Sequence, residues 1–285
     1  MPGMDGLTTL KHLMIRSPKP IVMLSTLTRE GSKTTFDALR YGAVDFIAKP
    51  AQSENGALEA QAQDLVAKVK LAAAVALDSV QYIRITARDK TLASAHQNAC
   101  ERVVVMGAAE GGYGALLKII PHLQPATSAA YLVVLYADPP HIDAFVRYLN
   151  EYSALPVQRA VDGAVIESGV CYIGAGDEYI TLTDHADRLA LHIHRAPFAS
   201  RRGSIDRLMF SVAETLNQQA AGVILSGAGE DGSEGLEEIH RVAGLAIIQD
   251  PQSCLHKEMT LAALARIHPD AMLSDAKIAI ALNRL

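Results

Sequence analysis

The N-terminal part of the chain shows an α/β pattern of hydrophobic and polar positions. Leu7, Leu10, Leu13 and Met14 recur at helical spacing, which predicts a short amphipathic helix. The segments after it predict, in order, a strand, a helix, a strand and a helix: 21–24, 32–41, 44–48 and 57–77. Helices and strands that alternate in this way are typical of an α/β domain with a parallel sheet.

A second α/β pattern begins near residue 102. Three consecutive valines within 102–106 predict a buried parallel strand. Gly107, Gly111 and Gly112 then permit a sharp turn into a helix, because glycine tolerates backbone conformations that other residues avoid. Further strands are expected at 131–135, 221–225 and 245–249, helices at 142–152, 204–218 and 233–243, several short strands over 157–191, and two shorter helices at the end.

The boundary between the two patterns is a polar segment. Residues 84–98 show little periodicity, unlike the helix-forming segment before them. We therefore expect an N-terminal domain over 1–82, a linker over 83–100 and a C-terminal domain over 101–285. Both domains are expected to be α/β, and the second is expected to contain mixed strands in its middle.

Composition narrows the class of protein. The 285 residues are 49% hydrophobic and 20% charged, which is ordinary for a globular protein with a sizeable core. A net charge of −5 argues against nucleic acid as a partner. No apolar run approaches the roughly 20 residues that cross a bilayer, so no membrane insertion is expected. Three widely spaced cysteines indicate a reducing, cytoplasmic compartment, and we expect no metal and no cofactor.

The turn after the 102–106 strand carries the candidate chemistry. Gly107, Ala109 and Gly111 have the spacing of G-x-S-x-G, in which a strand-to-helix turn presents a nucleophilic serine. Here the middle residue is alanine, which cannot attack an ester. The sequence therefore predicts a hydrolase scaffold without its nucleophile.

From residue 102 onwards, the chain resembles the catalytic domain of the chemotaxis protein-glutamate methylesterases, the CheB family. Four segments carry the resemblance. The family's G-A-S-T-G-G, P-S-V-D, L-T-G-M-G-x-D-G and Q-D-x-x-S-C correspond to 107–112, 203–206, 225–232 and 249–254. The resemblance implies an α/β methylesterase-type domain with a mostly parallel sheet, and a Ser-His-Asp triad that demethylates or deamidates receptor glutamate and glutamine side chains.

The resemblance also identifies what the triad has lost. The serine position is Ala109, the histidine position is Tyr136 or, with a shift of one residue, Ala137, and only the aspartate remains, as Asp231. A tyrosine has an ordinary pKa near 10 and is a poor base at neutral pH. Glu110 replaces the family's threonine and would repel an oxyanion. We therefore expect a pseudoenzyme.

The N-terminal segment resembles part of a response-regulator receiver domain, of the flavodoxin-like fold. The family pattern M-P-x-M-D-G is met at 1–6, the switch residues correspond to Ser25 and Phe46, and the phosphoryl-contacting lysine corresponds to Lys49. In the family, the phosphoacceptor aspartate lies upstream of this pattern, so before Met1. We interpret this start as a truncation or a misplaced start codon, and expect no phosphorylation control on this chain alone.

Together these resemblances predict a role in chemotaxis-type signal transduction. The expected partners are chemoreceptors or other chemotaxis-pathway proteins, and a histidine kinase if a complete receiver exists. The main hypothesis is a non-catalytic regulatory or receptor-binding homologue. The alternative is a residual methylesterase or deamidase that uses another nucleophile, with Ser204, Ser226 and His141 as weak candidates.

Three other signals have structural explanations that we favour. Gly227, Gly229 and Gly232 satisfy the dinucleotide fingerprint G-x-G-x-x-G, with Asp250 ending the next strand, but too little chain follows for a Rossmann domain. His192 and His194 are expected on the solvent face of a half-buried strand rather than in a metal site. Asp231, three residues before Glu234, is expected to cap its own helix.

Overall fold

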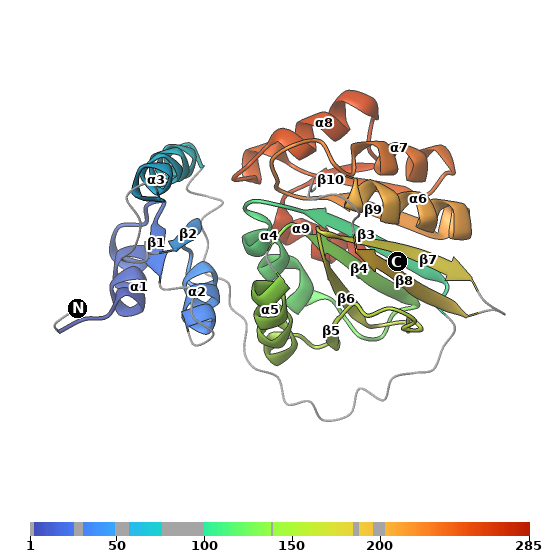
Figure 1. Ribbon diagram of the computed structural model, residues 1–285, viewed down its shortest axis with the longest axis horizontal. Helices are drawn as coiled ribbons and strands as arrows, with labels where there is room; N and C mark the ends of the chain where they lie inside the picture. The colour runs from blue at the N-terminus through green and yellow to red at the C-terminus, as the bar shows by residue number, and fades with distance from the viewer. Residues whose placement is uncertain are drawn as a thin grey trace. The chain divides into compact units, whose positions relative to one another are not determined.

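The computed structural model divides the chain into two compact units, Met1–Arg84 and Ile85–Leu285, which we describe separately. Each is an α/β unit (Figure 1), as predicted. The structure describes residues 3–25, 31–48, 57–75, 100–137, 139–184, 188–195 and 203–285.

In unit 1, five elements follow in the predicted order. They are α1 (Gly6–Arg16), β1 (Val22–Ser25), α2 (Gly31–Arg40), β2 (Asp45–Ala48) and α3 (Ala57–Ala73). Asp5 caps α1, because its carboxylate accepts the N–H of Thr8 at 2.8 Å. The two strands pair in parallel. Lys68 ties α3 to β2 through the carboxylate of Asp45 at 3.3 Å. The helix α3 ends before the expected residue 77, and residues 76–99 lie outside the described residues.

Unit 2 is built on a seven-stranded sheet in which every neighbouring pair is parallel (Figure 1). The strand order is β11-β10-β9-β3-β4-β6-β5. The strands are β3 (Arg102–Ala108), β4 (Ala129–Leu135), β5 (Val157–Arg159), β6 (Cys171–Ala175), β9 (Ala220–Ile224), β10 (Leu245–Gln249) and β11 (Ala271–Leu273). We did not predict β11, because three residues show no usable periodicity.

Helices cover both faces of this sheet. Figure 1 shows α4, α5 and α9 on one face and α6, α7 and α8 on the other. Their bounds are α4 (Gly112–Ile119), α5 (Pro139–Tyr152), α6 (Ser204–Leu216), α7 (Ser233–Arg241), α8 (Glu258–Arg266) and α9 (Asp275–Leu282), with short 3-10 turns η2 (Ile120–His122), η3 (Asn217–Gln219) and η4 (Pro251–Ser253). A sheet covered on both faces requires apolar central strands, which explains the continuous valine run in β3.

An antiparallel hairpin stands apart from the parallel sheet. It consists of β7 (Glu178–Asp184) and β8 (Leu189–Arg195), and it accounts for the mixed strands expected in the middle of this domain. The hairpin attaches to α6 through Leu182, whose N–H donates to Ser211 Oγ at 3.0 Å. His192 and His194 are both exposed on β8, as predicted for the solvent face of a half-buried strand.

The topology places a crevice at the carboxyl ends of β3 and β9. From β3 the chain proceeds to β4 on one side, and it later returns to β9 on the other side. In open α/β sheets, ligands bind outside the carboxyl ends of strands at such a switch point. The loops that follow β3, β4 and β9 therefore define the candidate site.

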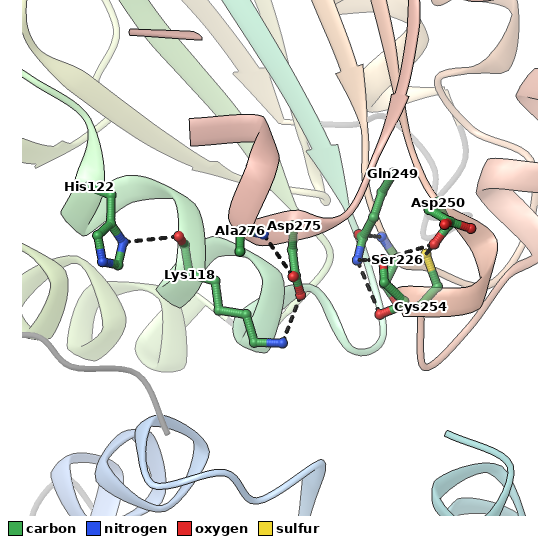
Figure 2. A network of polar contacts seen from close by, with 9 residues as sticks. Lys118, His122, Ser226, Gln249, Asp250, Cys254, Asp275 and Ala276 are labelled. Atoms are coloured by element: carbon green, nitrogen blue, oxygen red, sulfur yellow. Dashed lines mark hydrogen bonds and ion pairs between the residues drawn. The ribbon is translucent and has the colours of Figure 1, made fainter. Parts of the chain in front are cut away.

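Buried polar contacts hold these loops and the flanking helices (Figure 2). The Gln249 side chain, only 1% exposed, accepts the N–H of Ser226 at 2.9 Å and donates to the carbonyl of Ser253 at 3.3 Å. It thereby joins the loop after β9 to the loop after β10. On the face of the sheet that α4 and α9 cover, Lys118 of α4 donates to Asp275 of α9 at 2.8 Å.

Candidate active site

Ala109 lies in the turn between β3 and α4, where the sequence predicted a nucleophile elbow. Its N–H donates to the carbonyl of Ser226 at 3.0 Å, and its carbonyl accepts the N–H of Gly112 at 2.9 Å. Gly111 completes the turn at φ 82°, in the left-handed region that favours glycine. The turn thus holds Ala109 rigidly with 4% of its surface exposed, so that residue 109 presents a methyl group to the site.

Tyr136 follows β4 and faces the same site. Its N–H donates to the carbonyl of Ala108 at 3.0 Å, and its ring packs over Gly176, where a Cβ atom would clash with the ring at 2.0 Å. The hydroxyl donates to the carboxylate of Asp231. Burial, followed by the negative charge of Asp231, raises the pKa of Tyr136 above its ordinary value of 10.0. The side chain is therefore a neutral phenol at neutral pH and not a base.

Asp231 is 9% exposed and accepts hydrogen bonds from another helix as well as from Tyr136. Its two carboxylate oxygens accept the N–H groups of Ile205 at 3.0 Å and Asp206 at 3.1 Å, in the first turn of α6. A carboxylate at a helix N-terminus satisfies otherwise unpaired N–H groups and interacts favourably with the helix dipole. Asp231 therefore caps α6.

This arrangement corrects our expectation that Asp231 caps its own helix together with Glu234. The N-cap residue of α7 is Gly232, at φ 91°, which has no side chain that could cap the helix. Glu234 instead pairs with Arg266 at 2.7 Å. The capping-box prediction was wrong because Gly232, not Asp231, is the N-cap residue of α7. Asp231 lies one position before the N-cap, and its carboxylate accepts N–H groups of α6 instead.

Asp206 is a site residue that sequence reasoning did not single out. Its carboxylate accepts the N–H of Gly235 at 2.7 Å, so that it caps α7 while Asp231 caps α6. Burial, and then the neighbouring charge of Asp231, raises the pKa of Asp206 from 3.8 to about 6. An available signal was its place in the 203–206 segment that resembles P-S-V-D, at the third position of a helix.

The three expected triad positions share one cleft of about 800 Å³. Acidic side chains dominate its wall, and among the described residues that line it there is no lysine, arginine or histidine. The acids are Glu110, Asp206, Glu230, Asp231 and Glu234. Such a wall repels anions and favours neutral or cationic groups.

Glu110 reaches across this cleft. Its carboxylate accepts the N–H of Ala228 at 3.2 Å, in the loop after β9. Its backbone carbonyl accepts the hydroxyl of Ser226 at 2.9 Å, so Glu110 adds two hydrogen bonds to the one that Ala109 makes between the turn after β3 and the loop after β9. Glu110, which the sequence comparison places where the family has threonine, therefore adds an exposed carboxylate to the wall of the cleft.

The candidate replacement nucleophiles are engaged elsewhere. Ser204 and Ser226 are each 1% exposed, and their hydroxyls donate to the carbonyls of Gly176 at 2.6 Å and Glu110 at 2.9 Å. Neither lines the cleft. His141 is half-buried in the first turn of α5. These placements do not favour a rescued triad.

The dinucleotide-like loop packs against protein atoms. A Cβ atom on Gly227 would lie 2.1 Å from Met259 Sδ and 2.8 Å from Ala109 Cβ, so the space beside this glycine is filled. Asp250 accepts the N–H of Gln252 at 2.9 Å and caps η4. Both observations favour a structural role for the loop, and a cofactor titration remains the test of the alternative.

The receiver-type residues are only partly described. Ser25 ends β1 and pairs with Ala48 of β2, while Phe46 pairs with Met23 and is half-buried. Lys49 lies outside the described residues. The switch roles of these three residues stay predictions.

The described part of the chain lacks two further kinds of feature, a metal-binding cluster and a membrane-spanning helix. No group of three or more histidine, cysteine, aspartate or glutamate side chains there is arranged to hold a metal ion. None of the helices described has the length and apolar character required to cross a membrane.

Comparisons with known proteins agree on one family. The family model "CheB methylesterase" matches residues 104–282, and the model "Response regulator receiver domain" matches residues 1–69. The chain is 32% identical over 270 residues to a protein-glutamate methylesterase/protein-glutamine glutaminase of Pyrococcus horikoshii, covering 93% of this chain and 73% of that protein. It is 35% identical over 267 residues to the protein of that name from Symbiobacterium thermophilum, covering 90% and 73%.

A solved structure is similar as well. The Thermotoga maritima CheB methylesterase catalytic domain superposes with a TM-score of 0.61 at 26% identity, over 64% of this chain and 97% of that one. The match to the CheB methylesterase model lies within unit 2, and the receiver match lies within unit 1. The sequence resemblance to both families is thereby confirmed, and this chain belongs to the CheB methylesterase family, with a receiver-type domain preceding the esterase-type domain.

Proposed function

We propose that this protein is a non-catalytic CheB-type homologue that acts in chemotaxis-type signalling through binding rather than ester hydrolysis. The observation that carries the proposal is the contact between Tyr136 and Asp231 beside Ala109. The aspartate position is occupied and engaged, but its partner is a phenol, and the residue at the nucleophile position has no hydroxyl group.

The chemistry of ester hydrolysis explains why this arrangement is inactive. A triad needs a nucleophile, a base that takes its proton, and a carboxylate that orients the base. Ala109 cannot form an acyl-enzyme, and the raised pKa of Tyr136 removes it as a base. Loss of nucleophile and base typically costs on the order of a million-fold in turnover. The native chain should therefore show no more than background hydrolysis.

The partners follow from the family. Relatives named protein-glutamate methylesterase/protein-glutamine glutaminase act on glutamate esters and glutamine amides of proteins. We propose that this chain docks on the same class of protein, the chemoreceptors or another chemotaxis-pathway component, without modifying it. The receiver-type segment adds a histidine kinase as a candidate partner. We propose that this chain is cytoplasmic, as its cysteine usage predicts.

The test is methanol release from methylated chemoreceptor, measured for the native chain and for Asp231→Asn, with an active relative as the positive control. We expect both chains to remain at background. The same samples are then tested for receptor binding by co-sedimentation with receptor-containing membranes. Methanol release that falls in Asp231→Asn would contradict the proposal and support residual esterase activity. Inactivity without any binding would remove the docking role.

A further inference from the structure

Glu110 accepts a hydrogen bond from a backbone donor on the wall of the cleft, where both residues are exposed. Its carboxylate accepts the backbone N–H of Ala228 at 3.2 Å. Ala228 follows Gly227, where a Cβ atom would lie 2.8 Å from Ala109 Cβ and 3.1 Å from Ala109 N. The loop that carries the donor therefore packs directly against the nucleophile position. Ala109 and Ala228 both line the cleft.

A backbone N–H in such a place is suited to bind a negatively charged or carbonyl oxygen of a ligand. Here it already has an anionic acceptor, supplied by the protein itself. The turn that carries Glu110 is anchored, because its carbonyl accepts the Ser226 hydroxyl at 2.9 Å. A carboxylate tethered this closely competes strongly with one that must arrive from solution.

The remaining charges of the cleft act in the same direction. Asp206, Glu230 and Asp231 line it together with Glu110, and no described lining residue is basic. Glu234 also lines the cleft, but its carboxylate is paired with Arg266 at 2.7 Å. A ligand carboxylate would meet repulsion and would find this N–H engaged. A side-chain amide would meet neither obstacle, because its NH₂ group can donate to the Glu110 carboxylate.

We propose that Glu110 is the specificity-determining residue of this cleft and selects an uncharged side-chain amide, as in glutamine, over a glutamate carboxylate. This inference rests on the proposed binding function and names the side chain that the cleft accepts. A glutamate methyl ester ranks between the two, because it is uncharged but has no N–H to donate. The cleft thus distinguishes amidated or esterified sites on a partner from free carboxylates.

The experiment is an NMR titration of the ¹⁵N-labelled full chain, followed at the amide signal of Ala228. The probes are three blocked tripeptides, N-acetyl-Ala-X-Ala-amide, in which X is glutamine, glutamate γ-methyl ester or glutamate. In the native chain we expect saturable shifts with the glutamine peptide and affinity for the glutamate peptide at least about tenfold weaker. In Glu110→Gln the N–H of Ala228 loses its anionic acceptor. We expect the ratio of the affinities for the glutamine and glutamate peptides to fall by about tenfold.

Glu230→Gln is the matched control, because it removes the same charge from the same cleft. The ratio of the affinities for the glutamine and glutamate peptides should change less in this variant than in Glu110→Gln. Equal effects of the two substitutions, equal affinity of the native chain for the two peptides, or no shift at all with the glutamine peptide would each overturn the inference.

The two proposals fail in different ways. Methanol release by the native chain would contradict the absence of catalysis, whereas the peptide ratios report on selection by Glu110 and involve no chemical step. Ammonia is assayed in the glutamine titration, so that any deamidation is recognised and kept apart from binding.

Discussion

At the scale of single residues, Asp231, the aspartate predicted at a triad position, stabilises the fold. Asp231 accepts two N–H groups at the start of α6, and Asp206 accepts one at the start of α7. Asp231, which precedes α7, therefore caps α6, and Asp206, which lies in α6, caps α7. Unpaired N–H groups at a buried helix end are costly. A carboxylate at position 231 is thus useful without any histidine to orient.

The Asp206 carboxyl makes stability depend on pH. Its folded-state pKa of about 6 lies above the ordinary 3.8, so between about pH 4 and pH 6 the folded chain holds a proton that the unfolded chain has lost. The free energy of unfolding therefore falls as pH rises through this window. We expect Asp206→Asn, which cannot ionise but retains an acceptor oxygen, to show a flatter dependence.

The measurement is the urea midpoint of unfolding at several pH values from about 4 to about 7. Asp177→Asn, at an exposed position, serves as the control and should follow the native curve. If Asp206→Asn shows the native slope, the assigned proton-holding role is wrong.

At the scale of elements, the site depends on how tightly the turn after β3 packs against the loops after β9 and β10. Gly111 has φ 82°, and a Cβ atom there would lie 2.6 Å from Ser226 Oγ and 2.9 Å from Leu255 Cβ. The Ser226 hydroxyl also donates to Glu110. One glycine therefore permits the close approach that brings Ala109 and Glu110 into the cleft.

We expect Gly111→Ala to destabilise the chain by about 1–3 kcal/mol, through backbone strain and steric overlap. Gly114, three residues later in α4, has open space at its Cβ position and no positive φ. Gly114→Ala should therefore be neutral or stabilise by up to about 1 kcal/mol, because alanine favours helix over glycine. Urea unfolding of both variants gives the comparison. Similar free energies of unfolding for Gly111→Ala and Gly114→Ala would contradict this account of the turn.

At the scale of the whole molecule, the two units differ in what supports them. Unit 2 has a seven-stranded sheet with helices on both faces, whereas the described residues of unit 1 include one two-stranded sheet and three helices. Two strands have little independent stability without helix packing. The match to the CheB methylesterase model, over residues 104–282, lies entirely within unit 2, and the similar Thermotoga maritima structure is of a catalytic domain by itself.

We therefore expect residues 100–285, produced alone, to fold cooperatively. Its thermal transition should coincide with the main transition of the full chain, because the core of the large sheet lies within this segment. Circular dichroism and calorimetry of both proteins provide the measurement. A fragment without a cooperative transition, beside a full chain that has one, would show that unit 2 depends on unit 1.

Much of the architecture was predictable because it rests on local patterns. The valine run of β3 and the glycines at 111 and 112 specified a buried strand and a tight turn, and the structure confirms both. Gly107 was expected in the turn but lies within β3, which extends to Ala108 because it pairs with β4 and β9. Apolar runs of five or more residues and helical periodicity located the other main elements. The three-residue strand β11 was missed, because its place in the sheet depends on pairing with β10 rather than on its own sequence.

By itself, the sequence determined the α/β class and the family, and it predicted which chemical groups are missing from the triad positions, since these depend on residue identity and spacing along the chain. Only the tertiary structure decided where the remaining polar groups go. Asp231 bonds to a helix that begins 27 residues earlier, at Ser204, and Glu110 accepts an N–H from Ala228. Such contacts join segments far apart in sequence, and they exist only because parallel strands gather the ends of β3, β4 and β9 at one edge of the sheet.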